Sequence, residues 1–383
     1  MRRLLGNAGL VVLSLAVALV LLELGVRLLV PEGLWRFRDS TRDWTLDPEV
    51  GWVNRPALDV ESSSPTARVR FQTNSDGLIP AGVVRAKKPD VVRIMIFGDS
   101  MVVGRDLPQS ANYSARLEAL LRERGIAAEI INAGVAGYST DQALLLMQRW
   151  VPRYRPDLVI FASTSNDFGG NALRVANYQA KPMFRLDGNG RLVLSPPELV
   201  ANQIQPYGSG PRSWIQHWAL YRLLQPRIIM LRSRLGGWEQ RMLLGVMDEV
   251  YIEPRAADRV DWPLFSALLT QMREVANQNG AEFLVIAHPE VGEVWDPYID
   301  RMCEARGWPR DHYDRFALER HVAEAAEQAS VRFVPLVAEF SAHQDRGPFH
   351  LLPRDGHLSA AGHQLLAERL ADHLSDQLAS MQH

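Results

Sequence analysis

The sequence has very little cysteine and no excess of charge of either sign. Its single cysteine, Cys303, excludes an intrachain disulfide and is too few for a thiolate metal site. Because a free cysteine is usually a small buried hydrophobe, we interpret Cys303 as a structural thiol. The chain has 42 lysines and arginines against 44 aspartates and glutamates, a formal net charge of −2. This balance gives no reason to expect a nucleic-acid partner, so we predict none.

Several catalytic signatures are also absent from the sequence. There is no G-x-S-x-G elbow, no Walker A loop, no G-x-G-x-x-G and no H-E-x-x-H. These absences disfavour an ordinary α/β-hydrolase, a P-loop or dinucleotide-binding enzyme and a zinc protease of that type. The sequence also contains no internal repeat and no low-complexity tract.

A long apolar run lies near the start of the sequence. Residues 8–22 are all apolar, glycine or serine, they follow Arg2 and Arg3, and the apolar character continues beyond Glu23. A run of about twenty such residues is long enough to cross a bilayer, with the two arginines on the cytoplasmic side. We therefore predict that residues 1–32 form a transmembrane anchor, which would place the rest of the chain outside the cytoplasm. The alternative is a cleaved signal peptide and a secreted protein.

The remainder of the chain divides into two parts. Residues 33–90 contain many turn signals and one alternating stretch, residues 67–73, so we predict a linker that becomes an edge element. Residues 91–383 alternate between short apolar runs and helical spacing, which predicts a doubly wound α/β domain. We expect Thr140 and Ser359 to cap two of its helices. The expected strands lie near residues 92, 129, 158, 283 and 332, and the expected helices cover residues 110–124, 141–154, 262–278, 313–328 and 359–377.

Residues 171–254 interrupt this alternation and are predicted to be an insertion. A glycine-rich turn within residues 184–194 predicts a hairpin. The following residues contain Trp214, Trp218 and Trp238. Because aromatic residues usually pack together, we interpret the insertion as having its own small core, with a lid beside the site as the alternative.

Residues 91–100 are the most informative stretch. Residues 92–97 are apolar apart from Arg93, which is typical of a buried strand in a parallel sheet. The stretch ends in Gly98-Asp99-Ser100, where open α/β sheets place their ligands. Ser100 is therefore a candidate nucleophile, and such a serine needs a base and donors for an oxyanion.

Three later segments could supply these groups. A glycine-rich turn at residues 132–137 and the amide of Asn166 each follow an expected strand, whereas Asp355 and His357 precede the last expected helix. Since the carboxyl ends of parallel strands meet at one edge of a sheet, we expect these groups to converge on Ser100.

These segments resemble the four blocks of the SGNH (GDSL-like) hydrolase superfamily, from residue 91 to the C-terminus apart from the insertion. The blocks are, in order, Gly98-Asp99-Ser100, Gly137, Asn166-Asp167 and Asp355 with His357. The resemblance implies a three-layer α/β/α, flavodoxin-like fold around a five-stranded parallel sheet. It also implies an esterase, lipase, carbohydrate acetyl esterase or acyltransferase that requires no metal, and we predict no cofactor.

Carried over to this sequence, the resemblance makes Ser100 the nucleophile, His357 the base and Asp355 the residue that orients His357. The N–H groups of Ser100 and Gly137 and the side chain of Asn166 would form the oxyanion hole. Asp99 is interpreted as a turn residue that holds the serine in place.

Each of these roles has a simpler alternative. Ser100 could be a helix N-cap, Gly137 a turn glycine with Gly134 as its nearest rival, Asn166 an Asx-turn residue, and Asp355 and His357 surface loop residues. His350, His363 and His288 are competing histidines, and His288 could also line the pocket.

The last block departs from the spacing that is frequent in the superfamily, because it reads Asp-x-His instead of Asp-x-x-His. In this respect it is similar to extracytoplasmic polysaccharide O-acetyltransferase relatives. Our hypothesis is a serine esterase that acts by a Ser-His-Asp mechanism on a short acyl or acetyl ester of a cell-envelope carbohydrate. The alternatives are an O-acetyltransferase of an envelope polysaccharide and a non-catalytic glycan-binding assembly protein. The sequence makes no prediction of oligomeric state.

Overall fold

The computed structural model describes most of the chain. The described residues are 2–30, 43–63, 68–80, 82–176, 179–195, 218–221, 223–224, 250–252, 260–351 and 356–382.

A parallel sheet of five strands forms the centre of the fold, as predicted. Its order is β13-β12-β7-β5-β6, and every neighbouring pair is parallel. The strands are β5 (Val92–Gly98), β6 (Ala128–Asn132), β7 (Leu158–Ser163), β12 (Glu282–Ala287) and β13 (Arg332–Val334). The chain passes from β5 to β6 on one side and then returns to β7 on the other. This reversal creates a topological switch point at the carboxyl ends of β5 and β7, where open sheets bind ligands.

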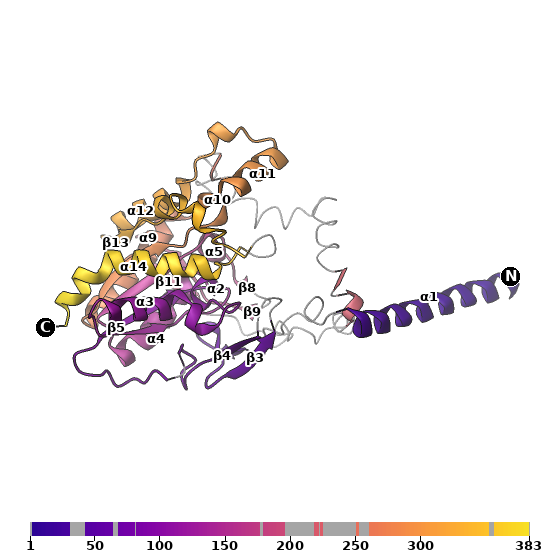
Figure 1. The fold of residues 1–383 in the computed structure, drawn as a ribbon, viewed down its shortest axis with the longest axis horizontal. Coiled ribbons are helices and arrows are strands. Elements are labelled where there is room, and N and C mark those ends of the chain that lie inside the picture. Colours follow the sequence, from indigo (N-terminus) through magenta and orange to yellow (C-terminus); the bar gives the residue numbers. More distant parts are fainter. Residues whose placement is uncertain are drawn as a thin grey trace.

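Helices cover both faces of the sheet. Ile94 and Ile96 of β5 pack on the face covered by α3 (Tyr113–Glu123) and α14 (Ala360–Ser380), which lie side by side in Figure 1. The alternate residues Met95 and Phe97 face the opposite layer, because successive side chains of a strand point to opposite sides. That layer contains α4 (Thr140–Tyr154), α9 (Trp262–Gln278) and α12 (Ala317–Gln328). The structure thus has the predicted three-layer α/β/α architecture.

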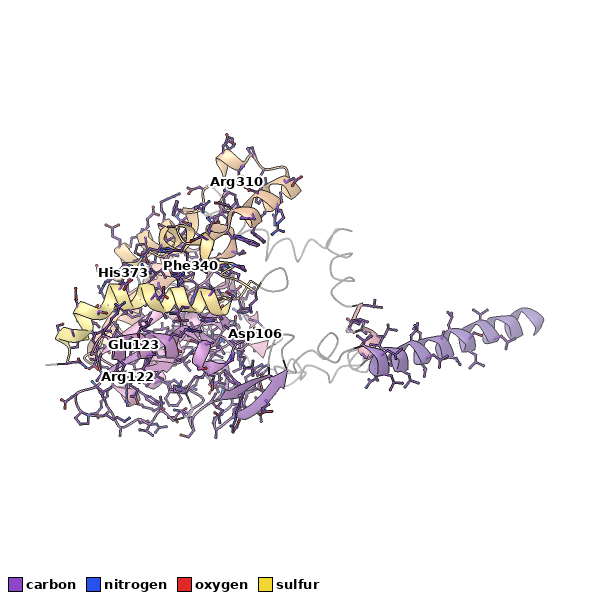
Figure 2. All side chains as sticks on the ribbon, viewed as in Figure 1. Asp106, Arg122, Glu123, Arg310, Phe340 and His373 are labelled. Carbon is purple, nitrogen blue, oxygen red and sulfur yellow. The ribbon has the colours of Figure 1, made fainter. Side chains whose placement is uncertain are left out.

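Shorter elements complete the domain. They are the helices α2 (Ser100–Val103), α5 (Ser165–Gly170), α10 (Val291–Val294), α11 (Asp296–Arg306) and α13 (Val337–Ser341), and the 3-10 turns Gln109–Ala111, Arg310–His312 and Gln344–Arg346. Helix α11 was not predicted from the sequence. Figure 2 shows Arg310 close to α11, well separated from Arg122 and Glu123 of α3.

One of the two predicted N-caps is confirmed. The Ser359 hydroxyl accepts a hydrogen bond from the Gly362 N–H at the start of α14. The prediction for Thr140 is wrong, because Ser139 is the N-cap of α4 and Thr140 is its first helical residue. The Thr140 hydroxyl instead donates to Asp167, a partner that is distant in sequence.

Two antiparallel hairpins precede the central sheet. They are formed by β1 (Trp44–Asp47) with β2 (Gly51–Asn54) and by β3 (Asp59–Ser63) with β4 (Arg68–Gln72), which confirms the strand predicted near residues 67–73. Trp52 of β2 belongs to the main hydrophobic core. Ile79 forms an antiparallel bridge with Asn132 of β6, at the edge of the sheet.

The described part of the predicted insertion contains two more hairpins. They are formed by β8 (Val175–Ala176) with β9 (Gln179–Ala180) and by β10 (Met183–Leu186) with β11 (Leu192–Ser195). The second is the hairpin predicted from the glycine-rich turn, and its Phe184 belongs to the main core. Trp214 and Trp238 lie outside the described residues. The choice between a lid and a separate core therefore stays a prediction.

Helix α1 (Arg2–Leu29) covers the apolar run near the start of the chain and extends away from the α/β body in Figure 1. Its Glu23 pairs with Arg27 at 2.6 Å and accepts hydrogen bonds from the backbone N–H groups of Ala219 and Leu220. Within the described ranges, no helix has both the length and the apolar character needed to span a membrane. The predicted transmembrane helix is therefore not supported by the structure.

Candidate active site

Ser100 lies where β5 ends and α2 begins. A side chain at Gly98 would clash, because a Cβ atom there would lie 2.6 Å from the carbonyl oxygen of Ala162 on β7. Asp99 is the N-cap of α2, and its Oδ1 accepts the Met101 N–H at 2.8 Å. Ser100 is the first residue of the helix, so the reading of Ser100 as an N-cap is wrong. The chain thus turns tightly at the switch point and leaves the capping role to Asp99.

His357 is brought directly to Ser100. Its Nε2 lies 2.7 Å from the Oγ of Ser100. The segment that carries it, between β13 and α14, is held by a bridge between His350 and Leu358 and by a hydrogen bond from the Leu351 N–H to the His357 carbonyl. When the serine hydroxyl donates to Nε2, the imidazole carries its proton on Nδ1. Asp355 lies outside the described residues, so its orienting role stays a prediction.

The three competing histidines are all buried. The Nε2 of His350 lies 2.9 Å from the Pro289 carbonyl, and the Nδ1 of His363 accepts the Tyr113 N–H at 3.2 Å. Neither ring nitrogen of His288 hydrogen-bonds to a described residue. Burial lowers the pKa of His350 to about 4 and the pKa values of His288 and His363 to about 3. These rings are neutral near pH 7, and none of them forms a hydrogen bond with Ser100 within the described residues.

Asp99 joins the first and third sequence blocks. Its Oδ2 accepts hydrogen bonds from the Thr164 hydroxyl and from the Nδ2 of Asn166, each at 3.0 Å. The Asn166 side chain therefore points to Asp99 instead of closing an Asx turn on its own backbone. An amide NH2 group has two protons, so Asn166 can donate one to Asp99 and still direct the other to a substrate oxygen.

The glycine-rich turn after β6 presents Gly137 in a left-handed conformation, with φ of +76°. Its N–H forms no hydrogen bond to another residue of the described ranges. Gly134, its rival, has a packing role, because a Cβ atom there would lie 2.7 Å from the Cβ of Val102. The positive φ also suits a simple turn glycine. The role of Gly137 in an oxyanion hole thus stays a prediction.

Two residues that sequence reasoning missed hold this turn. Trp52 donates its indole N–H to the Ala136 carbonyl at 3.0 Å, and the Nδ2 of Asn54 donates to the Gly134 carbonyl at 2.8 Å. Both lie on β2, in the stretch predicted to be a linker. The only sequence signal nearby is the Gly51-Trp52 turn signal, which says nothing about a contact with a distant loop.

A second missed group supports α5, the helix that carries Asn166. Lys181 pairs with Asp141 at 2.5 Å, and both side chains are fully buried. Lys181 also donates to the carbonyl of Gly170 at the end of α5. Burial, with the nearby Asp99 charge, raises the pKa of Asp167 well above its usual range. Its carboxyl accepts the Thr164 N–H at 2.7 Å, which closes the start of the same helix.

Among the described residues, no group of three or more His, Cys, Asp or Glu side chains is arranged to hold a metal ion. The groups that the structure brings together at the site are a serine, an imidazole and a side-chain amide. These are the groups needed for transfer of an acyl group to a hydroxyl and from there to water.

Residues 96–365 match the GDSL-like lipase/acylhydrolase family. Similar solved structures include TesA, with 15% identity and a TM-score of 0.39 over 74% of this chain and 98% of that one. An acetyl xylan esterase, AlAXEase, has 14% identity and a TM-score of 0.40 over 74% and 100%. A family 3 carbohydrate esterase of Clostridium thermocellum has 13% identity and a TM-score of 0.38 over 76% and 100%. No curated protein matches the chain.

Proposed function

Because the chain belongs to the GDSL-like lipase/acylhydrolase family, and is thus an enzyme that hydrolyses esters, we propose that Ser100 is its nucleophile and His357 its general base. The observation that carries this proposal is the 2.7 Å approach of the His357 Nε2 to the Ser100 Oγ. A serine hydroxyl becomes a nucleophile only when a positioned base removes its proton.

In the first half of the reaction, the Ser100 Oγ bonds to the ester carbonyl carbon while its proton moves to the His357 Nε2. The carbonyl oxygen becomes an oxyanion, which the N–H groups of Ser100 and Gly137 and the Asn166 amide stabilise. His357 then gives the proton to the departing alkoxide, and the acyl group remains on Ser100. In the second half, a water molecule attacks the acyl carbon while His357 takes its proton. The bond from the acyl carbon to the Ser100 Oγ then breaks, His357 returns the proton to the Oγ, and the acid is released. Asp355 accepts the Nδ1–H of His357 throughout and stabilises the imidazolium.

The proposed substrate is a short acyl or acetyl ester carried by a cell-envelope carbohydrate. The Asp-x-His spacing of Asp355 and His357 supports this class, because it resembles that of polysaccharide O-acetyltransferase relatives. Hydrolysis and transfer share the same acyl-enzyme and differ only in the acceptor. Turnover of p-nitrophenyl acetate with and without a glycan acceptor separates them, since a transferase forms an acetylated glycan and an esterase forms acetate.

The test of the mechanism compares three variants of the full chain. Ser100→Ala and His357→Gln should each lose nearly all hydrolysis of p-nitrophenyl acetate, and Ser100→Ala should also lose labelling by a fluorophosphonate. His350→Gln is the matched control, because His350 lies seven positions from His357 in sequence and its ring is hydrogen-bonded to the Pro289 carbonyl and not to Ser100. It should keep most of the activity. Full activity of Ser100→Ala, or absence of labelling in the folded wild-type protein, would contradict the proposal, and the latter would favour a glycan-binding role.

We also propose that the domain acts outside the cytoplasm. The support is the order of Arg2, Arg3 and the apolar residues 8–22, which is typical of an export signal. A fusion of the C-terminus to alkaline phosphatase, which is active only after export, tests this location. An inactive fusion that is produced at full length would contradict it.

A further inference from the structure

Trp52 makes a contact that no catalytic role explains. Its side chain is 1% exposed, and its indole N–H donates to the carbonyl oxygen of Ala136 at 3.0 Å, across 84 positions of sequence. The ring is held on the same loop by an edge-to-face contact with Tyr138, at 5.6 Å between ring centroids. The Tyr138 hydroxyl in turn donates to the Trp52 carbonyl. Trp52 and the turn after β6 are thus joined by three separate contacts.

The geometry of the peptide unit gives this contact a consequence. The Ala136 carbonyl and the Gly137 N–H belong to one planar trans peptide and point in opposite directions. A donor that holds the carbonyl oxygen therefore also sets the direction of the Gly137 N–H. This restraint matters here because Gly137 has φ of +76°, and a glycine rotates between backbone conformations at little cost. A peptide that precedes a glycine is free to turn over unless a neighbour holds it.

The hydrogen bond from Trp52 to the Ala136 carbonyl also makes the Gly137 N–H a stronger donor. A carbonyl that accepts a hydrogen bond polarises its peptide group, and the N–H at the other end becomes a better donor. The donor side of this bond is shielded from water, since Trp52 is almost fully buried, whereas Ala136 is half-buried. The second anchor of the turn, from Asn54 to the Gly134 carbonyl at 2.8 Å, holds a different peptide, so the hydrogen bond from Trp52 restrains the Ala136 carbonyl separately.

We propose that Trp52 is a positioning residue of the oxyanion hole, which aims the Gly137 N–H at the substrate by holding the carbonyl of Ala136. This inference rests on the proposed function, in which Gly137 is an oxyanion donor. It assigns a catalytic purpose to the hairpin of β1 and β2, which precedes the hydrolase blocks in the sequence.

The expected effect of a Trp52 substitution on kcat and KM depends on the stage of the reaction at which the oxyanion exists. The developing charge is present only in the transition state, so an imperfectly aimed donor lowers kcat and leaves KM nearly unchanged. Removal of a whole oxyanion donor costs about 100- to 1,000-fold in kcat, and misdirection of one donor of three should cost roughly 5- to 50-fold. A purely structural role for Trp52 would instead lower the melting temperature or the active fraction and leave kcat per active site unchanged.

The experiment uses the full chain and p-nitrophenyl acetate, with active sites counted by fluorophosphonate labelling. Trp52→Phe keeps a ring and removes the indole N–H. Replacement of Trp52 by 3-benzothienylalanine, which has the same shape with sulfur in place of the N–H, tests the contact if Trp52→Phe does not fold. Trp44→Phe is the matched control, because Trp44 lies on the paired strand at 6.4 Å between ring centroids from Trp52.

Support for the proposal is a roughly 5- to 50-fold lower kcat per labelled site in both Trp52 variants, with KM changed by less than about two-fold and Trp44→Phe like the wild type. Wild-type kcat per labelled site in the benzothienylalanine protein would overturn it. If the proposed function itself were wrong, Ser100→Ala would keep its activity, and this result would not depend on the Trp52 variants.

Discussion

The Nε2 of His357 lies 2.7 Å from the Oγ of Ser100, although the two residues are 257 positions apart in the sequence. The contact is possible because β5 places Ser100 at the switch point of the sheet, while the segment before α14 places His357 over the same edge. Other buried residues hold the strands, turns and short helices of the fold in position, and four predictions concern them.

The first prediction concerns Asp99, whose two carboxylate oxygens accept hydrogen bonds from three donors in two segments of the chain. Asp99→Ala leaves the Met101 N–H and the Thr164 hydroxyl without their acceptor and releases the Asn166 amide. We expect a loss of about 1–3 kcal/mol in the free energy of unfolding and a fall in kcat of about 10-fold or more. Urea unfolding and p-nitrophenyl acetate turnover measure the two effects.

The control for this prediction is Asp106→Asn, in the loop that follows α2 and labelled in Figure 2. It should change neither quantity appreciably. A folded Asp99→Ala protein with wild-type kcat would show that Asp99 does not position Asn166.

The second prediction concerns acid stability. Burial lowers the pKa values of His288 and His363 to about 3 and that of His350 to about 4, from 6.5. Below pH 6.5 the unfolded chain therefore binds protons at these sites that the folded chain does not. Stability is thus highest above pH 6.5 and falls as the pH decreases towards 4, by about 1.4 kcal/mol per pH unit for each histidine.

Urea unfolding measures this slope over a range from about pH 7.5 to about pH 4.5, which spans the titration of histidine in the unfolded chain. His288→Leu removes one of the three protonation sites and should make the slope shallower, whereas His312→Gln, on the surface, should leave it unchanged. Equal slopes in all three proteins would contradict the assignment of the buried histidines as neutral.

The third prediction concerns the buried ion pair of Lys181 and Asp141. Lys181→Met leaves a fully buried carboxylate without its cationic partner, which typically costs about 3–5 kcal/mol. The double variant Lys181→Met/Asp141→Leu removes both charges and should recover much of that loss. A double-mutant cycle by urea unfolding measures the coupling, and strictly additive losses would show that the pair does not act as a unit. Arg70→Met, in an exposed pair with Asp59, is the control and should have little effect.

The fourth prediction concerns Arg93, the one charged residue in the central strand. Its side chain is fully buried and forms hydrogen bonds with Glu129 and with the carbonyls of Val84, Arg85, Ala86 and Tyr154. Arg93→Met leaves these acceptors unpaired and should cost about 3–5 kcal/mol in the free energy of unfolding.

Arg93→Lys should not restore that stability, because an ammonium lacks the planar fork that reaches several acceptors at once. Arg122→Met on the exposed face of α3, labelled in Figure 2, is the control and should be close to neutral. A lysine variant as stable as the wild type would show that only the charge of Arg93 matters.

The sheet and the order of the four blocks could be predicted from the amino-acid sequence alone. The continuous apolar run of β5, the helical spacing of α4, α9 and α14, and the polar residues at the strand ends are all patterns of neighbouring residues, which a sequence displays directly. Ser100 and His357 could be paired in advance because parallel strands end at one edge of a sheet, and because the resemblance to the SGNH superfamily assigns them the roles of nucleophile and base.

The contacts that support the site became visible only in the three-dimensional structure. Trp52 reaches Ala136 across 84 positions, Lys181 reaches Asp141 across 40, and Arg93 binds carbonyls from two other segments. No local period encodes such contacts, because they depend on where separate elements meet after packing. A tryptophan in a presumed linker and a lysine in a presumed insertion look like surface residues in the sequence. Burial against distant carbonyls and a carboxylate makes them part of the framework around Ser100.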